Sequence, residues 1–364
     1  MRDAGHGGDG AGDATRSSEG RPGLAASWAL LRWLLVIATA WFLLKELAPI
    51  LRPLLLAVFL AYVILPVGGY VKGHVRGGAG QLTLLLGMGA VCVGVAVFAY
   101  GDLVGLSHEL PRLHEGMKEI LATATTYTRE HVPQLTNALT GTARAEEVGT
   151  ARLQQTLESL ASTTANVFVE ALQVGFFLVL ILVEARRFPQ RLRDAFTDDQ
   201  AEEMLSMTSN INAAMASYLK AKVKVNVALA VPAMVVLWIF GIKFVVLWGV
   251  LTFLANFVPY LGSVVACTLP ILFGFLDLGM GWQPLAAALL LICVHLLSAY
   301  LVEPALTGKA VDLSPLVVLV ALSFWGLCWG LVGMVLAVPL TAMLKIILQH
   351  TASTRPLGRL MGGE

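Results

Sequence analysis

The chain has 364 residues, of which 57% are hydrophobic and 13% are charged, and its formal net charge is +1. Soluble globular proteins average about 45–50% apolar and roughly 25% charged residues, so this chain has too few polar groups to be wetted as a globule. The composition indicates a membrane protein, and the near-zero net charge excludes a strong global field that would attract nucleic acid or acidic substrates.

The first 24 residues are rich in Gly, Asp, Ser and Arg and predict a disordered tail. They are too long and too acidic for the leading part of a cleavable signal peptide, so we expect the first apolar segment to be retained as a span. We expect a transmembrane domain over residues 25–350 and a cytoplasmic tail over residues 351–364.

A spanning helix needs about 20 mostly apolar residues. The first half of the chain predicts spans at residues 28–47, 50–71, 81–104 and 164–183. Residues 105–165 are polar, but their apolar side chains recur at steps of three and four, which predicts an extramembrane helical hairpin. Packing against the bundle or a neighbouring subunit explains this apolar stripe, and a partner-binding or lid role is the alternative.

After a basic loop and a fifth span that ends near Phe240, the chain enters an apolar run over residues 244–278. As one helix this run would measure about 52 Å, whereas the hydrocarbon core is about 30 Å thick. The run must therefore break, and Pro259 and Gly262 predict where. Non-helical backbone at membrane depth is tolerated only inside protein or beside a wet cavity.

A seventh span is expected over residues 284–302, and the last apolar run, over residues 316–348, is again too long for one straight span. Gly326, Gly330, Gly333 and Pro339 are the positions at which it could bend. Counting each broken run as one net crossing gives an all-α bundle of about eight spans with broken or re-entrant helices. Basic residues in the short loops then favour cytoplasmic N- and C-termini.

Several motifs of the second half occur together in a characteristic order. They are Tyr218-Leu219 with Lys222, residues 253–262, residues 303–308, Leu313-Ser314-Pro315 and residues 330–342. With these motifs, the sequence resembles the autoinducer-2 exporter family of bacterial membrane proteins across about residues 25–350. The resemblance implies export of autoinducer-2, or sodium(lithium)/proton antiport as in some members, and it implies homo-oligomers. Phe324-Trp325 departs from the small residues that many members carry there.

Ionisable residues inside spans are costly and make candidates for the transport pathway. Glu303, beside Pro304, could bind a cation or a proton, and the alternative is an interfacial carboxylate that pairs with Lys309, which we also place in the pathway. At 100° per residue, His295 and Glu303 fall within about 80° of arc, which allows one polar face and a proton relay. A hydrogen bond from His295 to another helix is the alternative.

Polar residues also flank the break in the sixth segment, where Asn256, Tyr260 and Ser263 accompany Pro259 and Gly262. Broken helices present free backbone groups to substrates in many transporters, so these five residues are our main candidates for the solute pathway. The alternative is a turn whose polar groups are satisfied by neighbouring helices.

The sequence has no phosphate-binding Gly-rich lysine motif, no His-Glu-x-x-His and no G-x-S-x-G. We therefore expect neither an enzyme nor a cofactor or metal. We predict a secondary transporter or exporter of a small polar solute in the bacterial cytoplasmic membrane, with a sodium(lithium)/proton antiporter as the alternative. A non-transporting oligomeric membrane protein with a partner-binding hairpin is the alternative of another class.

Overall fold

The computed structural model describes residues 22–71, 169–185, 187–307, 312–350 and 353–363, together with residues 94, 98, 101, 102, 104–106 and 109. These residues form two compact units, Met1–Leu51 and Arg52–Glu364, each of which is described by itself. Every element in the described ranges is a helix, which confirms the expected all-α class. Most of the predicted third span and of the extramembrane hairpin at 105–165 lies outside the described residues.

The first two elements correspond to the first two predicted spans. Helix α1 (Pro22–Glu46) exposes large apolar side chains such as Leu35 and Ile37, as a helix surrounded by lipid does. Helix α2 (Ala48–Val71) follows after a break at Leu47. Within this pair, Leu34–Glu46 and Ala48–Val63 are together long and apolar enough for one broken span.

The second unit is organised along one long helix. After α6 (Phe188–Ala195), α7 (Asp198–Ile239) runs for 42 residues without interruption, in spite of Pro232 in its interior. Thr197 is the N-cap residue of α7, and its hydroxyl makes no capping hydrogen bond. At 1.5 Å per residue α7 measures about 63 Å, so its charged first half extends beyond a hydrocarbon core of about 30 Å.

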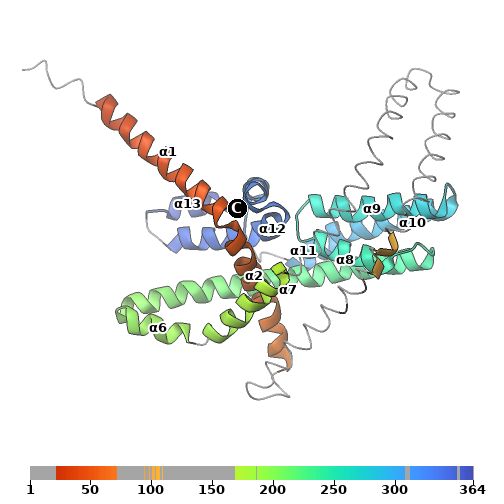
Figure 1. Ribbon diagram of the computed structural model, residues 1–364, viewed down its shortest axis with the longest axis horizontal. Coiled ribbons are helices and arrows are strands. Elements are labelled where there is room, and N and C mark those ends of the chain that lie inside the picture. Colours follow the sequence, from red (N-terminus) through yellow and green to blue (C-terminus); the bar gives the residue numbers. More distant parts are fainter. Residues whose placement is uncertain are drawn as a thin grey trace, which may run out of the picture. The chain divides into compact units, whose positions relative to one another are not determined.

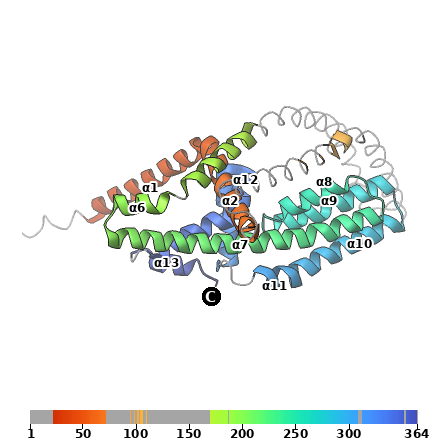
Figure 2. The ribbon, with the colours of Figure 1, turned by 90° about the horizontal axis from the view of Figure 1, so that it is seen from below.

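The first broken run folds back on itself. Helix α8 (Val245–Ala255) leads into a turn at residues 256–260, and α9 (Leu261–Leu278) returns. The two ends meet, because the Lys243 N–H donates to the Asp277 carboxylate over 3.1 Å and its ammonium lies 3.7 Å from the same group. We call residues 243–278 the first hairpin. In Figures 1 and 2, α8 and α9 lie beside the C-terminal half of α7.

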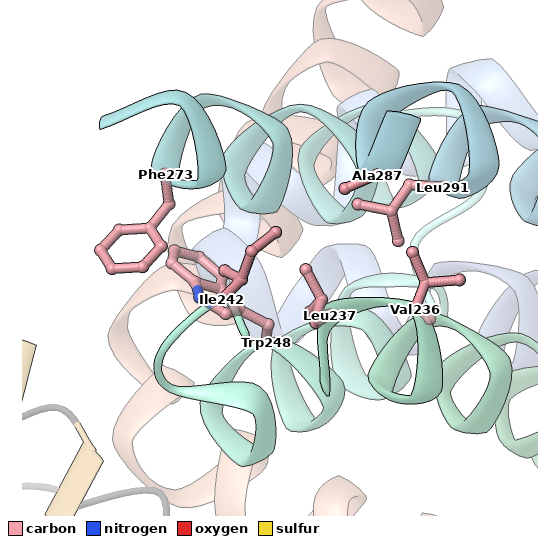
Figure 3. Packing of buried hydrophobic residues seen from close by; sticks show 8 residues of the cluster. Val236, Leu237, Ile242, Trp248, Phe273, Ala287 and Leu291 are labelled. Carbon is pink, nitrogen blue, oxygen red and sulfur yellow. The ribbon is translucent and has the colours of Figure 1, made fainter. Parts of the chain in front are cut away.

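Helix α10 (Trp282–Leu297) returns along α7 and continues through a π-helical turn, η2 (Ser298–Val302), into α11 (Glu303–Thr307). An apolar core joins these elements to the open end of the first hairpin (Figure 3). Its buried members include Val236, Leu237, Ile242, Trp248, Phe273, Ala287 and Leu291. This core fixes the hairpin and α10 on α7 and thereby places the break in α8–α9 against the middle of that helix.

The second broken run, α12 (Pro315–His350), also reverses direction, at Gly330. Gly330 has a backbone φ of 64°, which L-residues with a side chain rarely adopt. The indole N–H of Trp325 reaches the Thr341 hydroxyl over 3.2 Å, although these residues would be about 24 Å apart in a straight helix. Lys345 binds the Asp312 carboxylate over 2.9 Å, so the ends of this second hairpin, residues 312–350, also meet.

The described residues do not confirm the expected count of about eight spans. We counted each broken run as one net crossing, whereas in the structure each run folds back so that its two ends lie together. Four helices of the described part are long and apolar enough to span, and the α1–α2 pair brings the number to five. They are Asp198–Ile239, Leu261–Leu278, Trp282–Leu306 and Pro315–His350. The chain ends in α13 (Arg355–Leu360), a helix within the expected tail.

Candidate functional site

Three polar side chains connect the tip of the first hairpin to α7. The amide of Asn226 donates to the carbonyl of Phe253 over 2.9 Å and accepts from the Asn256 amide over 2.8 Å. The Ser263 hydroxyl, on the first turn of α9, donates to the side-chain amide oxygen of Asn256 over 3.1 Å. Asn226 and Asn256 are almost completely buried. The three side chains therefore form one continuous hydrogen-bonded line, from α7 across the break in α8–α9.

The backbone at this tip requires residues of particular shape. A Cβ at Gly262 would overlap the carbonyl oxygen of Ala255, so only glycine permits α9 to start so close to the end of α8. Tyr260 has a φ of 63° and ψ of −60°, and its side chain is 55% exposed. Pro259, which has no N–H, sits in the turn where no helical hydrogen bond is needed. Glycine and proline thus make the break that the sequence predicted at these positions.

A buried charge lies one helical turn from this line. The Lys222 ammonium is 2.7 Å from a carboxylate oxygen of Glu303, and the side chains are 4% and 37% exposed, respectively. Lys222 is four residues before Asn226, so both lie on the same face of α7. Glu303 follows the π-helical turn η2, and such turns are common at functional sites.

His295 and Glu303, which we expected on one polar face, are separated by the π-helical turn η2, and their shared face stays a prediction. His295 and Ser298 are buried, whereas Tyr300 is 76% exposed. The expected arc assumed 3.6 residues per turn, and the π-helical turn between His295 and Glu303 changes that register. Nδ1 of His295 lies 2.9 Å from the Leu291 carbonyl, and Nε2 has no hydrogen-bond partner among the residues that the structure describes.

Sequence reasoning missed Lys222 as a site residue, although it belongs to one of the motifs. Because Lys222 lies at the boundary between the charged and the apolar half of α7, its position favours the interpretation that it marks the end of a membrane span and is not a buried charge. The available signal was its spacing of four residues from Asn226, a polar residue inside the predicted fifth span. Lys309, the alternative partner of Glu303, lies outside the described residues.

The arrangement gathers polar side chains of several chemical kinds at one place. The polar line and the Lys222–Glu303 ion pair bring amide, hydroxyl, ammonium and carboxylate groups together at the break of an apolar hairpin. No cluster of metal-ligating side chains occurs within the described ranges. Polar groups at a helix break within an apolar bundle are the usual form of a binding site in secondary transporters. Fold and site together define a polytopic α-helical membrane protein of the transporter class.

The chain belongs to the AI-2E family of transporters, which matches residues 30–353. It is 26% identical over 323 residues to the protein YhhT of Escherichia coli (strain K12), an alignment that covers 86% of this chain and 88% of that protein. It is 29% identical over 209 residues to the AI-2 transport protein TqsA of the same organism, covering 57% of this chain and 59% of TqsA.

A relative in Borreliella burgdorferi is 28% identical over 203 residues, which cover 54% of this chain and 55% of that protein. The alignments with TqsA and with the Borreliella protein thus span little more than half of those relatives, whereas the family match covers most of the chain. The family relationship confirms the resemblance that the motifs indicated and makes this chain an integral membrane transporter.

Proposed function

We propose that the protein is a secondary transporter that exports a small, polar, uncharged solute of the autoinducer type. The observation that carries the proposal is the hydrogen-bonded line from Asn226 through Asn256 to Ser263 at the tip of the first hairpin. Amide and hydroxyl groups both donate and accept hydrogen bonds, which suits hydroxyl and carbonyl groups of a neutral solute. TqsA, a relative, is named as an AI-2 transport protein, which supports this solute class.

In this proposal the solute replaces hydrogen bonds that the side chains make with one another. Asn256 lies in the turn between two helices, so a small movement of the tip would free its amide from Asn226 and Ser263. The buried asparagines would then need a new partner, because an unpaired buried amide costs about 1–3 kcal/mol. A solute with two or more hydroxyl groups satisfies this need, and an apolar solute does not.

Sodium(lithium)/proton antiport is the second candidate, and the Lys222–Glu303 ion pair favours it. A lysine that is 4% exposed within an apolar bundle is costly unless its charge is balanced, and the Glu303 carboxylate balances it. A cation or a proton that binds this carboxylate would compete with Lys222. Such competition is one physical basis for coupling the flux of two ions.

Proteoliposomes test the two candidates against each other. Export predicts counterflow of a radiolabelled autoinducer-type solute that falls about tenfold or more in Asn256→Ala and is retained in the matched variant Ser323→Ala. Ser323 is exposed and donates only to Leu319 of its own helix. Antiport predicts instead that a pH-sensitive dye inside the vesicles responds to external sodium or lithium, and that Glu303→Gln abolishes the response.

A different outcome would favour the non-transporting alternative. If tight vesicles with correctly inserted protein carry neither the solute nor a coupled cation, the transport proposal for these residues fails. The protein would then act through a partner, as proposed from the apolar stripe at residues 105–165, or through its own oligomer, as proposed from the family resemblance. We further propose the bacterial cytoplasmic membrane as its location, with both termini in the cytoplasm, since Arg187, Arg191 and Arg193 cluster in one short connection.

A further inference from the structure

A basic pocket lies at the end of the second hairpin, away from the candidate solute pathway. It has a volume of about 400 Å³ and is lined by Gln349, His350, Arg355 and Arg359. The first two residues come from the last turn of α12, and the arginines come from α13. A pocket of this size is large enough for a small ligand or a lipid headgroup.

Specific contacts hold α13 against the hairpin, so the pocket is formed before any ligand binds. The Ser314 N–H donates to the Met361 carbonyl over 3.1 Å, and the Gly363 N–H donates to the Asp312 carboxylate over 2.9 Å. The Gln349 amide donates to the Gly358 carbonyl over 3.3 Å. A side chain at position 358 would collide with Gln349, so glycine allows this close approach.

The pocket carries positive charge that the neighbouring protein groups do not neutralise. Arg355 and Arg359 are four residues apart and therefore lie on one face of α13. Within the described part of the chain, neither arginine forms an ion pair with a carboxylate. The carboxylate of Asp312 is already bound to Lys345. Arginine presents several N–H donors in a planar fork that matches the oxygens of a phosphate group.

The pocket is surrounded by exposed apolar side chains, as a site at the surface of a bilayer would be. Leu357 and Leu360 of α13 are 56% and 77% exposed, and Ile347 in the last turns of α12 is exposed as well. A short helix with exposed leucines and arginines, joined to the end of a membrane helix, has the composition of an interfacial segment. Basic pockets beside transmembrane helices bind the headgroups of anionic lipids.

We propose that this pocket binds the phosphate of an anionic phospholipid headgroup, with Arg355 and Arg359 as its ligands. The headgroup would hold α13 at the bilayer surface and, through Asp312 and Ser314, steady the open end of the second hairpin. This site is independent of the proposed solute pathway, because it uses none of the residues at the tip of the first hairpin.

Lipid titration of the purified protein in detergent tests the site. Short-chain phosphatidylglycerol should raise the thermal unfolding midpoint, and short-chain phosphatidylcholine at equal concentration should not. In Arg355→Gln/Arg359→Gln the half-saturating concentration of phosphatidylglycerol should rise about tenfold or more, since each basic residue near a lipid surface contributes about 1 kcal/mol. The matched control Arg187→Gln/Arg193→Gln removes the same charge from exposed positions elsewhere and should leave that concentration unchanged.

Three results would overturn the proposal. Equal half-saturation in wild type and Arg355→Gln/Arg359→Gln would remove the arginines as ligands. An equal rise of the half-saturating concentration in the control variant Arg187→Gln/Arg193→Gln would show that overall charge causes the effect. Stabilisation by inorganic phosphate at the same concentrations, with the same dependence on the two arginines, would make the ligand a free anion and overturn the lipid as its source. An unliganded unfolding midpoint equal to that of the wild type verifies that each variant is folded.

Discussion

The two partners of the Lys222–Glu303 ion pair differ in burial: the ammonium is buried and the carboxylate is partly exposed. Removing Glu303 leaves the buried Lys222 charge without its counter-ion, whereas removing Lys222 leaves a carboxylate that is partly exposed. Removing one partner of a buried pair is destabilising because it leaves an uncompensated charge, whereas replacing both partners by apolar residues is often nearly neutral. The two residues should therefore respond differently to substitution.

We expect Glu303→Gln to lower the free energy of unfolding by about 1–3 kcal/mol, because it leaves the Lys222 charge buried beside a neutral amide. Lys222→Met should cost less, because the charge that it leaves is partly exposed, and the double variant Lys222→Met/Glu303→Met should remain within about 1 kcal/mol of the wild type. Thermal unfolding of the purified variants in detergent measures this order.

Lys220→Met is the matched control, since this lysine is exposed two residues away on the same helix and should have little effect. If Lys222→Met destabilised the protein more than Glu303→Gln, the lysine would owe its burial to packing of its aliphatic chain and not to charge compensation.

At the scale of elements, both apolar runs form hairpins, and the sequence predicted only part of this. The broken run at residues 244–278 was recognisable because its length exceeds the bilayer and Pro259 and Gly262 mark the break. For the last run, Gly330 was one of four possible positions, and no local signal distinguished it from Gly326 or Gly333.

The reversal of direction in each hairpin was not predictable, because it depends on contacts between residues far apart in the chain. Lys243 pairs with Asp277, and Lys345 pairs with Asp312. Proline and glycine indicate where a helix ends, but they do not fix the direction in which the next helix starts. The same reason explains the site: Asn256 and Ser263 were predicted as neighbours of the break, but their connection to Asn226 on α7 was not.

The first hairpin provides a prediction of its own. Gly262→Ala should destabilise the protein by about 1–3 kcal/mol or more, because the new methyl group overlaps the backbone carbonyl of Ala255 and must push α8 and α9 apart. Gly281→Ala is the matched control, since its Cβ would approach the Pro284 ring no closer than 4.0 Å. Equal unfolding midpoints for the two variants would show that the tip is not packed as described.

At the scale of the whole molecule, composition and periodicity predicted an all-α membrane protein, but they did not give the number of crossings. Eight spans followed from counting each broken run once. The described residues do not confirm that count, because the two ends of each hairpin lie together and the predicted span at residues 81–104 lies largely outside the described residues. Orientation by basic residues depends on this count, so the sidedness of each hairpin has to be measured.

Labelling of single cysteines in a cysteine-free protein measures the sidedness. Ile239→Cys and Met280→Cys flank the first hairpin at exposed positions, and a membrane-impermeant maleimide should label both from the same side. Ser314→Cys lies at the start of the second hairpin and Ser353→Cys lies just after its end, and they should likewise behave as a pair. Labelling of either pair from opposite sides would mean that the run crosses once and that the hairpin does not form in the membrane.

We propose that solute passes along the polar line at the tip of the first hairpin. One measurement tests this proposal most directly. Ser263→Cys in the cysteine-free background is reconstituted, and solute counterflow is followed while a charged methanethiosulfonate reagent is added. We predict that the reagent blocks flux and that a saturating solute slows this block, because both occupy the same site. Ser323→Cys, on an exposed face of α12, should be unaffected. Flux that persists after complete modification of Cys at position 263 would contradict the account.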